Sequence, residues 1–327
     1  MAVSTGVPEK TLAVQATKVY RAVGFAKGYN FWGWFFLVTS LLIFTLTRMT
    51  YFNFYNVFCG GTGLAKGDMG AASPGECFYY LQPGRYMVSI KAHLWTILPA
   101  ALLACGQFTP IFRRKALWLH RINGWISVVL SFIATAFAIP LLPRTMGGGV
   151  DVITMNLLLA AMFVVSIYYG VKTAREHKIQ QHRAWMMRAW IYGGSIITLR
   201  VIMEIASIWM SFVGNFYHVL PCDKVEYMVK GQNLSMNYFR EEFPECAPYW
   251  LGQDPERHVA VRAYVLEFDP VGIAAAHNMS FGMSGYMAIL IHFVGLEAYL
   301  YYTDRKQSFF APKAAKTGEN GHAAKVE

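Results

Sequence analysis

The chain has 327 residues, of which 55% are hydrophobic and only 15% are charged, whereas a typical soluble protein has about 25% charged residues. This composition excludes a pair of ordinary soluble domains and an intrinsically disordered chain, and five cysteines are too few for a disulfide-dense small protein. The net charge of +10 does not indicate nucleic-acid binding, because the basic residues are scattered between long apolar runs. We therefore predict an integral membrane protein, whose first partner is the lipid bilayer.

A helix needs about 20 mostly apolar residues to cross about 30 Å of hydrocarbon. In chain order, the segments that qualify are 31–46, 86–112, 116–142, 152–171, 184–213 and 271–302. We predict an all-α fold: a six-helix transmembrane bundle over residues 31–302 with a four-helix core. Residues 50–85 form an outer loop in this prediction, and residues 214–270 form one long outer loop.

Most Lys and Arg residues fall on one side of the predicted bundle. That side receives the segment 1–30, the connections around residues 113–115 and 172–183, and the tail 303–327, which we expect to be disordered. Because basic residues are enriched in cytoplasmic segments, both termini are predicted to be cytoplasmic. We expect an endomembrane or the plasma membrane, since a mitochondrial presequence explains the N-terminal segment less well than a cytoplasmic helix does.

The cysteines follow the same topology. Cys59 and Cys77 lie in the first outer loop, and Cys222 and Cys246 lie in the long outer loop. Two pairs outside, and none in a cytoplasmic loop, are typical of disulfides in an oxidising compartment. Asn233 begins an Asn-Leu-Ser sequon in the long outer loop, which predicts a glycosylation site.

Several ionisable side chains lie within the predicted spans, where they are costly unless they face the bundle interior and find a partner. His93 and His277 each lie about two turns inside spans that enter from the outer side, so the two are predicted to be level. His120 and His182 lie near the beginnings of spans that enter from the cytoplasmic side, and they are predicted to be level with each other.

Two tiers of histidine pairs are what a membrane b-type cytochrome requires, because haem iron accepts an axial imidazole on each face. The sequence therefore predicts haem b, with His120 and His182 as one pair of iron ligands and His93 and His277 as the other. Gly124, one turn after His120, would let the flat macrocycle approach the backbone. Arg200 would neutralise a haem propionate or an acidic substrate, unless it only pairs with Glu204 four residues later. The alternative for each histidine is an interfacial contact or a buried hydrogen bond between helices.

Motifs over about residues 86–205 resemble a known family. They are Lys91–His93, Gly106–Phe108, Arg113–Arg114, Leu119–Trp125, His182–Arg188 and Thr198–Arg200. In order and spacing they resemble the domain-of-unknown-function 2306 family of predicted membrane proteins. The resemblance implies that His93, Gln107, His120, Arg121, His182, Arg188 and Arg200 are characteristic polar positions, but it implies no reaction. The four-helix unit is also similar in outline to transmembrane ascorbate-dependent cytochromes b, although no histidine of the fourth helix faces His93.

The leading functional hypothesis is a haem-binding electron-transfer protein, which would be an oxidoreductase. Its electron donor and acceptor are not identified by the sequence. A second class is a small-molecule transporter or sensor, with His93, Arg200 and Glu204 around an intramembrane site. A third is a membrane-bound biosynthetic enzyme that acts on a small apolar substrate, a lipid or an isoprenoid, with histidines as acid and base. A structural subunit of a membrane complex is the fourth.

Overall fold

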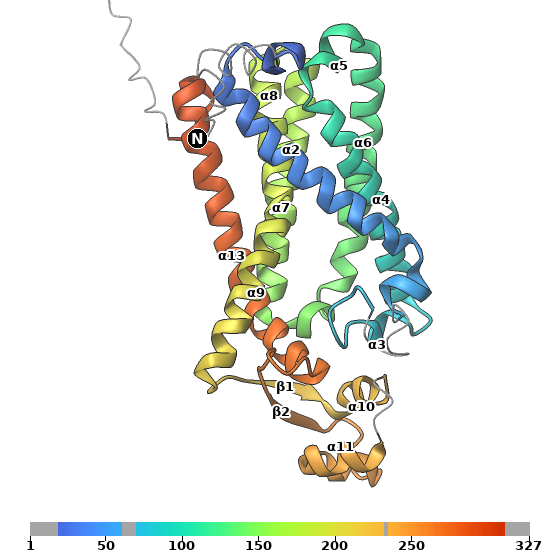
Figure 1. Cartoon of the computed structure of the whole chain (residues 1–327). Helices are drawn as coiled ribbons and strands as arrows, with labels where there is room; N and C mark the ends of the chain where they lie inside the picture. Colours follow the sequence, from blue (N-terminus) through green and yellow to red (C-terminus); the bar gives the residue numbers. More distant parts are fainter. Residues whose placement is uncertain (1–18, 61–69, 232–234, 311–327) are drawn as a thin grey trace, which may run out of the picture.

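The computed structural model describes residues 19–60, 70–231 and 235–310. In these ranges the chain is almost entirely helical, and six helical segments are long and apolar enough to cross a membrane, as the sequence predicts (Figure 1). The spans are α2 (Gly28–Arg48), α4 (Arg85–Gln107), α6 (Leu117–Ala138), α7 (Val150–Arg175), α8 (Ile179–Gly193) continued by α9 (Ser195–Val213), and α13 (Pro270–Thr303). The chain is a multi-pass membrane protein.

Two of these spans depart from the predicted bounds. The second was predicted to reach residue 112, but α4 ends at Gln107 and a short helix, α5 (Pro110–Lys115), follows. Proline disfavours helical geometry in the residue before it, and Thr109 is accordingly extended. The fifth span begins five residues earlier than the predicted residue 184 and is divided at Gly194, where α8 gives way to α9.

The bundle is built from helix pairs. Helix α4 packs along α6, α7 along α8, and α9 along α13, while α2 lies diagonally across one face of the bundle (Figure 1). The first two pairs meet through a shared apolar core that includes Ala100, Ala104, Phe163 and Trp190. Helices α7 and α13 approach closely because Gly282 and Gly285 have no side chains to separate them.

The two ends of the bundle differ. Helix α2 begins and α13 ends at one end, which we call the terminal end (Figure 1). The opposite end carries both disulfides, Cys59–Cys77 and Cys222–Cys246, and we call it the disulfide end. The predicted pairs of cysteines are thus confirmed as two bonds, with Cα–Cα distances of 5.5 and 5.8 Å.

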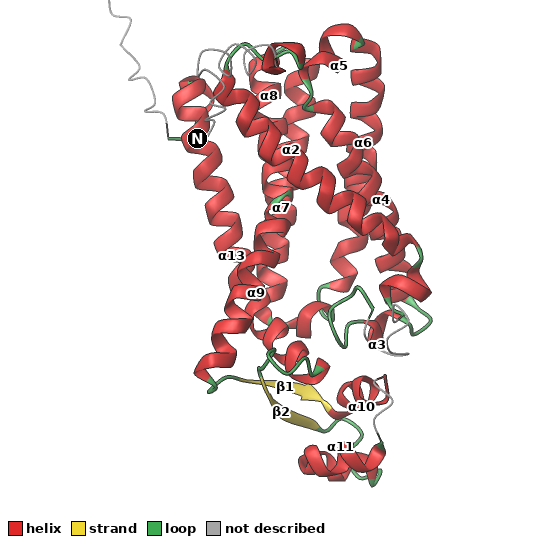
Figure 2. Ribbon diagram, viewed as in Figure 1, coloured by secondary structure: helices red, strands yellow, loops and turns green. Residues whose placement is uncertain are grey.

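The segment predicted as one long outer loop is folded. It contains strands β1 (Tyr217–Pro221) and β2 (His258–Arg262), which pair antiparallel with Tyr217 opposite Arg262, and helices α10 (Cys222–Gly231), α11 (Met236–Glu242) and α12 (Ala247–Trp250) (Figure 2). These elements form a small cap with its own apolar core, in which Val225, Met228 and Phe239 are fully buried beside the disulfide Cys222–Cys246.

The cap is joined to the segment between α2 and α4 by a buried ion pair. That segment contains α3 (Cys77–Tyr80) and the single-turn helices Met49–Phe52 and Phe54–Phe58. Glu76 Oε1 lies 3.5 Å from Lys224 Nζ of α10, and both side chains are almost completely buried. The other oxygen of Glu76 accepts hydrogen bonds from the Tyr80 hydroxyl and the Met146 amide. The two predicted outer loops therefore pack together as one structure.

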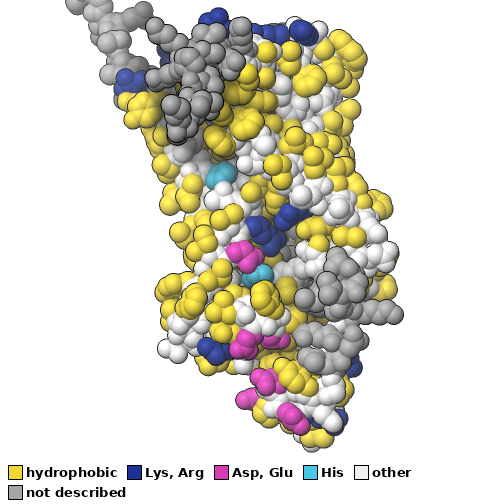
Figure 3. All heavy atoms as spheres, viewed as in Figure 1, with side chains coloured by type: hydrophobic (Ala, Val, Ile, Leu, Met, Phe, Trp, Pro, Cys, Tyr) yellow, Lys and Arg dark blue, Asp and Glu magenta, His cyan; other side chains and the backbone are white. Residues whose placement is uncertain are grey.

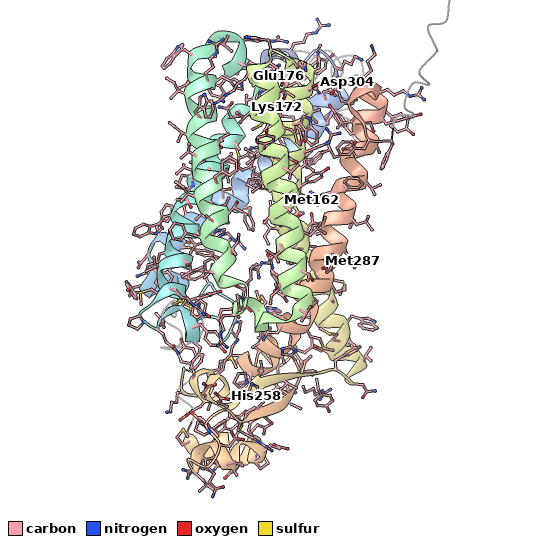
Figure 4. The ribbon with its side chains drawn as sticks, turned by 180° about the vertical axis from the view of Figure 1, so that it is seen from behind. Met162, Lys172, Glu176, His258, Met287 and Asp304 are labelled. Carbon is pink, nitrogen blue, oxygen red and sulfur yellow. A yellow bond between two sulfur atoms is a disulfide. The ribbon has the colours of Figure 1, made fainter. Side chains whose placement is uncertain are left out.

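Further single-turn helices lie at Ile139–Leu141, Thr145–Gly148 and Pro244–Cys246, and another, Arg305–Gln307, follows α13. At the terminal end, the side chains of Lys172 and Glu176 on α7 lie level with Asp304 beyond α13, whereas His258 lies in the cap (Figure 4). The predicted glycosylation site Asn233 lies outside the described residues, as do residues 1–18 of the predicted N-terminal segment and 311–327 of the predicted tail.

Candidate functional site

His277 contacts polar side chains from two other segments of the chain. It lies two turns from the start of α13 and is 8% exposed. Its Nδ1 is 2.9 Å from the hydroxyl of Ser73, in the segment between α2 and α4, and its Nε2 is 3.4 Å from Oε1 of Glu204 on α9. Three segments that are distant in sequence therefore meet at one imidazole.

Arg200 lies one turn before Glu204 on α9, so a pair within the helix was one expectation. The carboxylate of Glu204 instead contacts His277, and Arg200 makes no ion pair or hydrogen bond with any residue in the described ranges. Its guanidinium lies 5.5 Å from the centroid of the Phe281 ring. A span that carries a cation without a counter-ion is a candidate binding site for an anion.

A second arginine adds to the positive charge near Arg200. Arg48, the last residue of α2, is among its electrostatic neighbours, together with Tyr51, Glu76 and Glu204. The Arg48 guanidinium bonds to Thr47 and covers the Phe44 ring at 4.5 Å, and within the described chain no carboxylate pairs with it. Glu76 forms its ion pair with Lys224 rather than with either arginine.

We refer to Ser73, Arg200, Glu204 and His277 as the polar cluster. It reaches the molecular surface through Glu204, whose side chain is 56% exposed. Basic, acidic and histidine side chains gather half-way along this face of the molecule, in a surface that is otherwise largely apolar (Figure 3). The cluster is therefore accessible from the side of the bundle, where an embedded protein faces lipid.

His93 is separate from the polar cluster. Its Nδ1 lies 2.9 Å from the carbonyl oxygen of Ala134, so the ring connects α4 to α6. Both ring nitrogens of His277 contact other residues, and the contacts of the described chain do not bring His93 and His277 together. The prediction that these two histidines are level does not make them partners, because each ring contacts other residues.

The other predicted pair lies at the terminal end, with His120 on α6 and His182 on α8, and the charge of His182 influences His120. His182 Nδ1 lies 2.8 Å from the carbonyl oxygen of Gly170, which leaves Nε2 of that ring without a hydrogen bond in the described structure. His120 Nδ1 is buried and has no hydrogen-bond partner among the described residues.

The space predicted beside Gly124 is occupied in this structure. The side chain of Gln107 lies over that glycine, with Oε1 3.6 Å from the position a Cβ would take, and its Nε2 donates to the carbonyl oxygen of His120. Within the described residues, no three His, Cys, Asp or Glu side chains gather as a metal site. An axial haem pair needs only two imidazoles, so this finding does not bear on His120 and His182.

A groove of about 460 Å³ opens between α6 and α7. Its walls are mainly apolar, with Trp125, Val128 and Phe132 on α6 and Tyr168 and Val171 on α7, and Lys172, Arg175 and Glu176 lie at one end. Lys172 and Glu176 mark that end at the top of Figure 4. The groove therefore lies toward the terminal end of α6 and α7 and shares no residue with the polar cluster.

Two residues with notable contacts were not identified from the sequence. Ser73 is a loop serine, and no pattern of neighbouring residues marks it. Glu297 lies in the last third of α13 and forms a buried ion pair with Arg188, with Nε to Oε1 at 2.7 Å. An acidic residue inside an apolar span was the signal that could have identified Glu297.

Residues 90–220 match the family model described as "Predicted membrane protein (DUF2306)". The resemblance predicted from the sequence motifs is confirmed, over a segment that runs from α4 to β1. It contains Arg200 and Glu204 of the polar cluster and both His120 and His182, whereas Ser73 and His277 lie outside it. No curated protein and no solved structure matches the chain.

Proposed function

We propose that the protein is a membrane-embedded carrier or sensor for an anionic amphiphile, whose acidic group binds Arg200. The observation that carries this proposal is the unpaired guanidinium of Arg200 within a span, with Arg48 nearby and no ion pair to either from the described residues. An arginine within a span is costly without a partner, and a phosphate or carboxylate from the ligand would provide one.

Access to the cluster favours a ligand that arrives through the bilayer. Helix α2 crosses the face of the bundle and buries only Phe31 and Thr45 among its 21 residues. Glu204 is exposed at the edge of the cluster, on the side that lipid would cover. The acyl chain of an amphiphile can remain in lipid beside α2 and α9 while its acidic group reaches the two arginines.

The test is binding by the full-length protein in detergent, with oleoyl lysophosphatidic acid as probe and neutral monoolein as its uncharged counterpart. A hydrogen bond to a charged group contributes about 1.5–3 kcal/mol, so Arg200→Gln should weaken binding of the anionic probe by about 10- to 100-fold. Arg121→Gln, which removes an exposed arginine of α6, should not change it. Equal binding of both probes, or an unchanged affinity in Arg200→Gln, would refute the proposal.

His120 and His182 support a second candidate function, in which these two histidines hold a single haem b. Ligating histidines commonly donate their other ring nitrogen to a backbone carbonyl, as His182 can to Gly170, and the partnerless buried nitrogen of His120 is consistent with a missing ligand. Bound haem would supply one-electron chemistry at the terminal end of the bundle. One such site does not span the membrane, so this candidate is a redox sensor or one half of an electron path.

An absorption spectrum of the purified protein, before and after dithionite, tests the haem candidate. His120→Ala and His182→Ala should each abolish the reducible bands, whereas His177→Ala, which removes an exposed histidine, should leave them intact. Absence of these bands from protein purified with added haem would exclude this candidate and leave the anion site unaffected.

A further inference from the structure

The contacts of His277 resemble the wiring of a nucleophilic serine. The hydroxyl of Ser73 lies at one ring nitrogen of His277, at 2.9 Å, and the carboxylate of Glu204 lies at the other, at 3.4 Å. A hydroxyl, an imidazole and a carboxylate in this order form the relay that activates serine in many unrelated hydrolases, where geometry rather than sequence position identifies it. The anion-binding role proposed for Arg200 does not require these contacts.

The partners of His277 suit one tautomer of its neutral ring. An ionised carboxylate only accepts hydrogen bonds, so a proton on Nε2 faces Glu204 with a donor. In that tautomer Nδ1 presents its lone pair to the Ser73 hydroxyl, which then donates. This is the arrangement in which an imidazole can remove the proton of a serine as the oxygen attacks.

The position of the three residues favours a reaction on a membrane-borne substrate. Ser73 belongs to the segment between α2 and α4 at the disulfide end, while His277 and Glu204 belong to spans. The relay thus lies where an extramembrane segment meets the bundle, so water and lipid can both reach it. Arg200, one turn from Glu204, lies close enough to hold the acidic group of the same molecule.

We propose that Ser73, His277 and Glu204 form a catalytic relay that hydrolyses a carboxylic ester of an anionic amphiphile. The choice of an anionic substrate rests on the function proposed for Arg200, whereas the reaction rests on the contacts of His277 alone. Ser73 is the nucleophile, His277 is the general base and then the general acid, and Glu204 is a positioning residue that holds the imidazole and stabilises its charged form.

The reaction balances with water as the only co-reactant. The Ser73 oxygen bonds to the ester carbonyl carbon while its proton passes to Nδ1 of His277. The carbon–oxygen bond to the leaving alcohol then breaks, and the alcohol takes the proton from Nδ1, which leaves an acyl ester on Ser73. Water then attacks this ester while Nδ1 of His277 accepts its proton. The bond between the Ser73 oxygen and the acyl carbon breaks, the serine oxygen takes the proton back from Nδ1, and the carboxylic acid is released.

A fluorophosphonate with a neutral alkyl chain tests the relay directly, because it reacts covalently with activated serines. The full-length protein in detergent should be labelled once, and mass spectrometry should locate the label on Ser73. Ser73→Ala should abolish labelling, and His277→Gln should slow it by about 100- to 10,000-fold, the range expected for loss of a general base. Ser235→Ala, which changes an exposed helix-capping serine, should be labelled as the wild type is.

A role limited to holding the loop would give a different result. Ser73→Thr keeps the hydroxyl and its hydrogen bond and should retain folding. If all variants melt at the wild-type temperature and the wild type carries no label on Ser73, the proposal is overturned. The neutral probe does not need Arg200, so Arg200→Gln should still be labelled while losing hydrolysis of oleoyl lysophosphatidic acid. Labelling without that loss would refute the role of Arg200 and leave the relay standing.

Discussion

The ion pair between Arg188 and Glu297 offers a sharp test of how the terminal end of the bundle is held together. Arg188 donates to both carboxylate oxygens, at 2.7 and 3.0 Å, and its Nη2 also donates to the carbonyl oxygen of Gln307. The two side chains are 2% and 0% exposed, and the carboxylate further accepts from the Phe309 amide. The pair therefore fastens the segment after α13 onto α8.

Removing one charge should be far more costly than removing both. Glu297→Gln leaves the guanidinium of Arg188 buried without a counter-ion, which costs about 3–5 kcal/mol in comparable sites. In the double variant Arg188→Met/Glu297→Leu no charge remains buried, so most of this loss should be recovered. A residual cost of about 1 kcal/mol is expected, because the Phe309 amide loses its acceptor.

The assay is reversible unfolding of the purified protein in mixed micelles, with the free energy extrapolated to zero denaturant. Glu176→Gln is the matched control, because Glu176 pairs with Lys178 at a surface where the two side chains are 37% and 55% exposed. Its effect should be much smaller than that of Glu297→Gln, because solvent screens this pair. The reasoning fails if Glu297→Gln is no worse than this control, or if the double variant is as unstable as the single one.

Three further predictions concern packing, the disulfide and pH. Replacing Cys222 and Cys246 by Ser should lower the free energy of unfolding by about 3 kcal/mol, because their bond closes a loop with a sequence separation of 24. Unfolding of this variant and of the wild type, both without reductant, measures the difference, and equal free energies of unfolding would contradict the prediction. Gly282→Ala should cost about 1–3 kcal/mol, since the added methyl would overlap the carboxylate of Asp151 on α7, and a wild-type melting temperature would show that the two helices can separate freely. Burial and the nearby Lys224 lower the pKa of His218 in β1, despite an opposing effect of Asp151. The unfolded chain then binds this proton more readily than the folded one, so stability should fall as pH decreases below about 6.5, and His218→Gln should flatten that dependence in a melting series from pH 8 to 5.

The bundle itself was predictable because the bilayer imposes a local requirement. A span must contain about 20 apolar residues whatever it packs against, so composition alone located all six. The bounds were less accurate where a single residue acts through backbone geometry, as Pro110 does after α4 and Gly194 does between α8 and α9. From the sequence the cap was predicted as a loop, although α10 is amphipathic, because its strands and helices are stabilised by one another and by a disulfide across distant residues.

For the candidate site, the sequence identified individual residues but not the contacts between them. The sequence identified His277, Arg200 and Glu204 as polar groups out of place in hydrocarbon, and each lies in or beside the polar cluster. It did not identify their partners, because contact between side chains depends on which helix faces which. His93 was predicted at the height of His277, yet it bonds to Ala134 of the neighbouring helix.

The amino-acid sequence by itself determined that this chain crosses a membrane, how often it does so, and which cysteines lie on a common side. These features follow from the cost of exposing polar groups to lipid, which each segment meets on its own. Only the tertiary structure decided that Ser73 reaches an imidazole 204 residues further along the chain, and that Arg200 has no counter-ion from the described residues. Such contacts arise from the packing of whole helices and loops, a collective result that no single segment specifies.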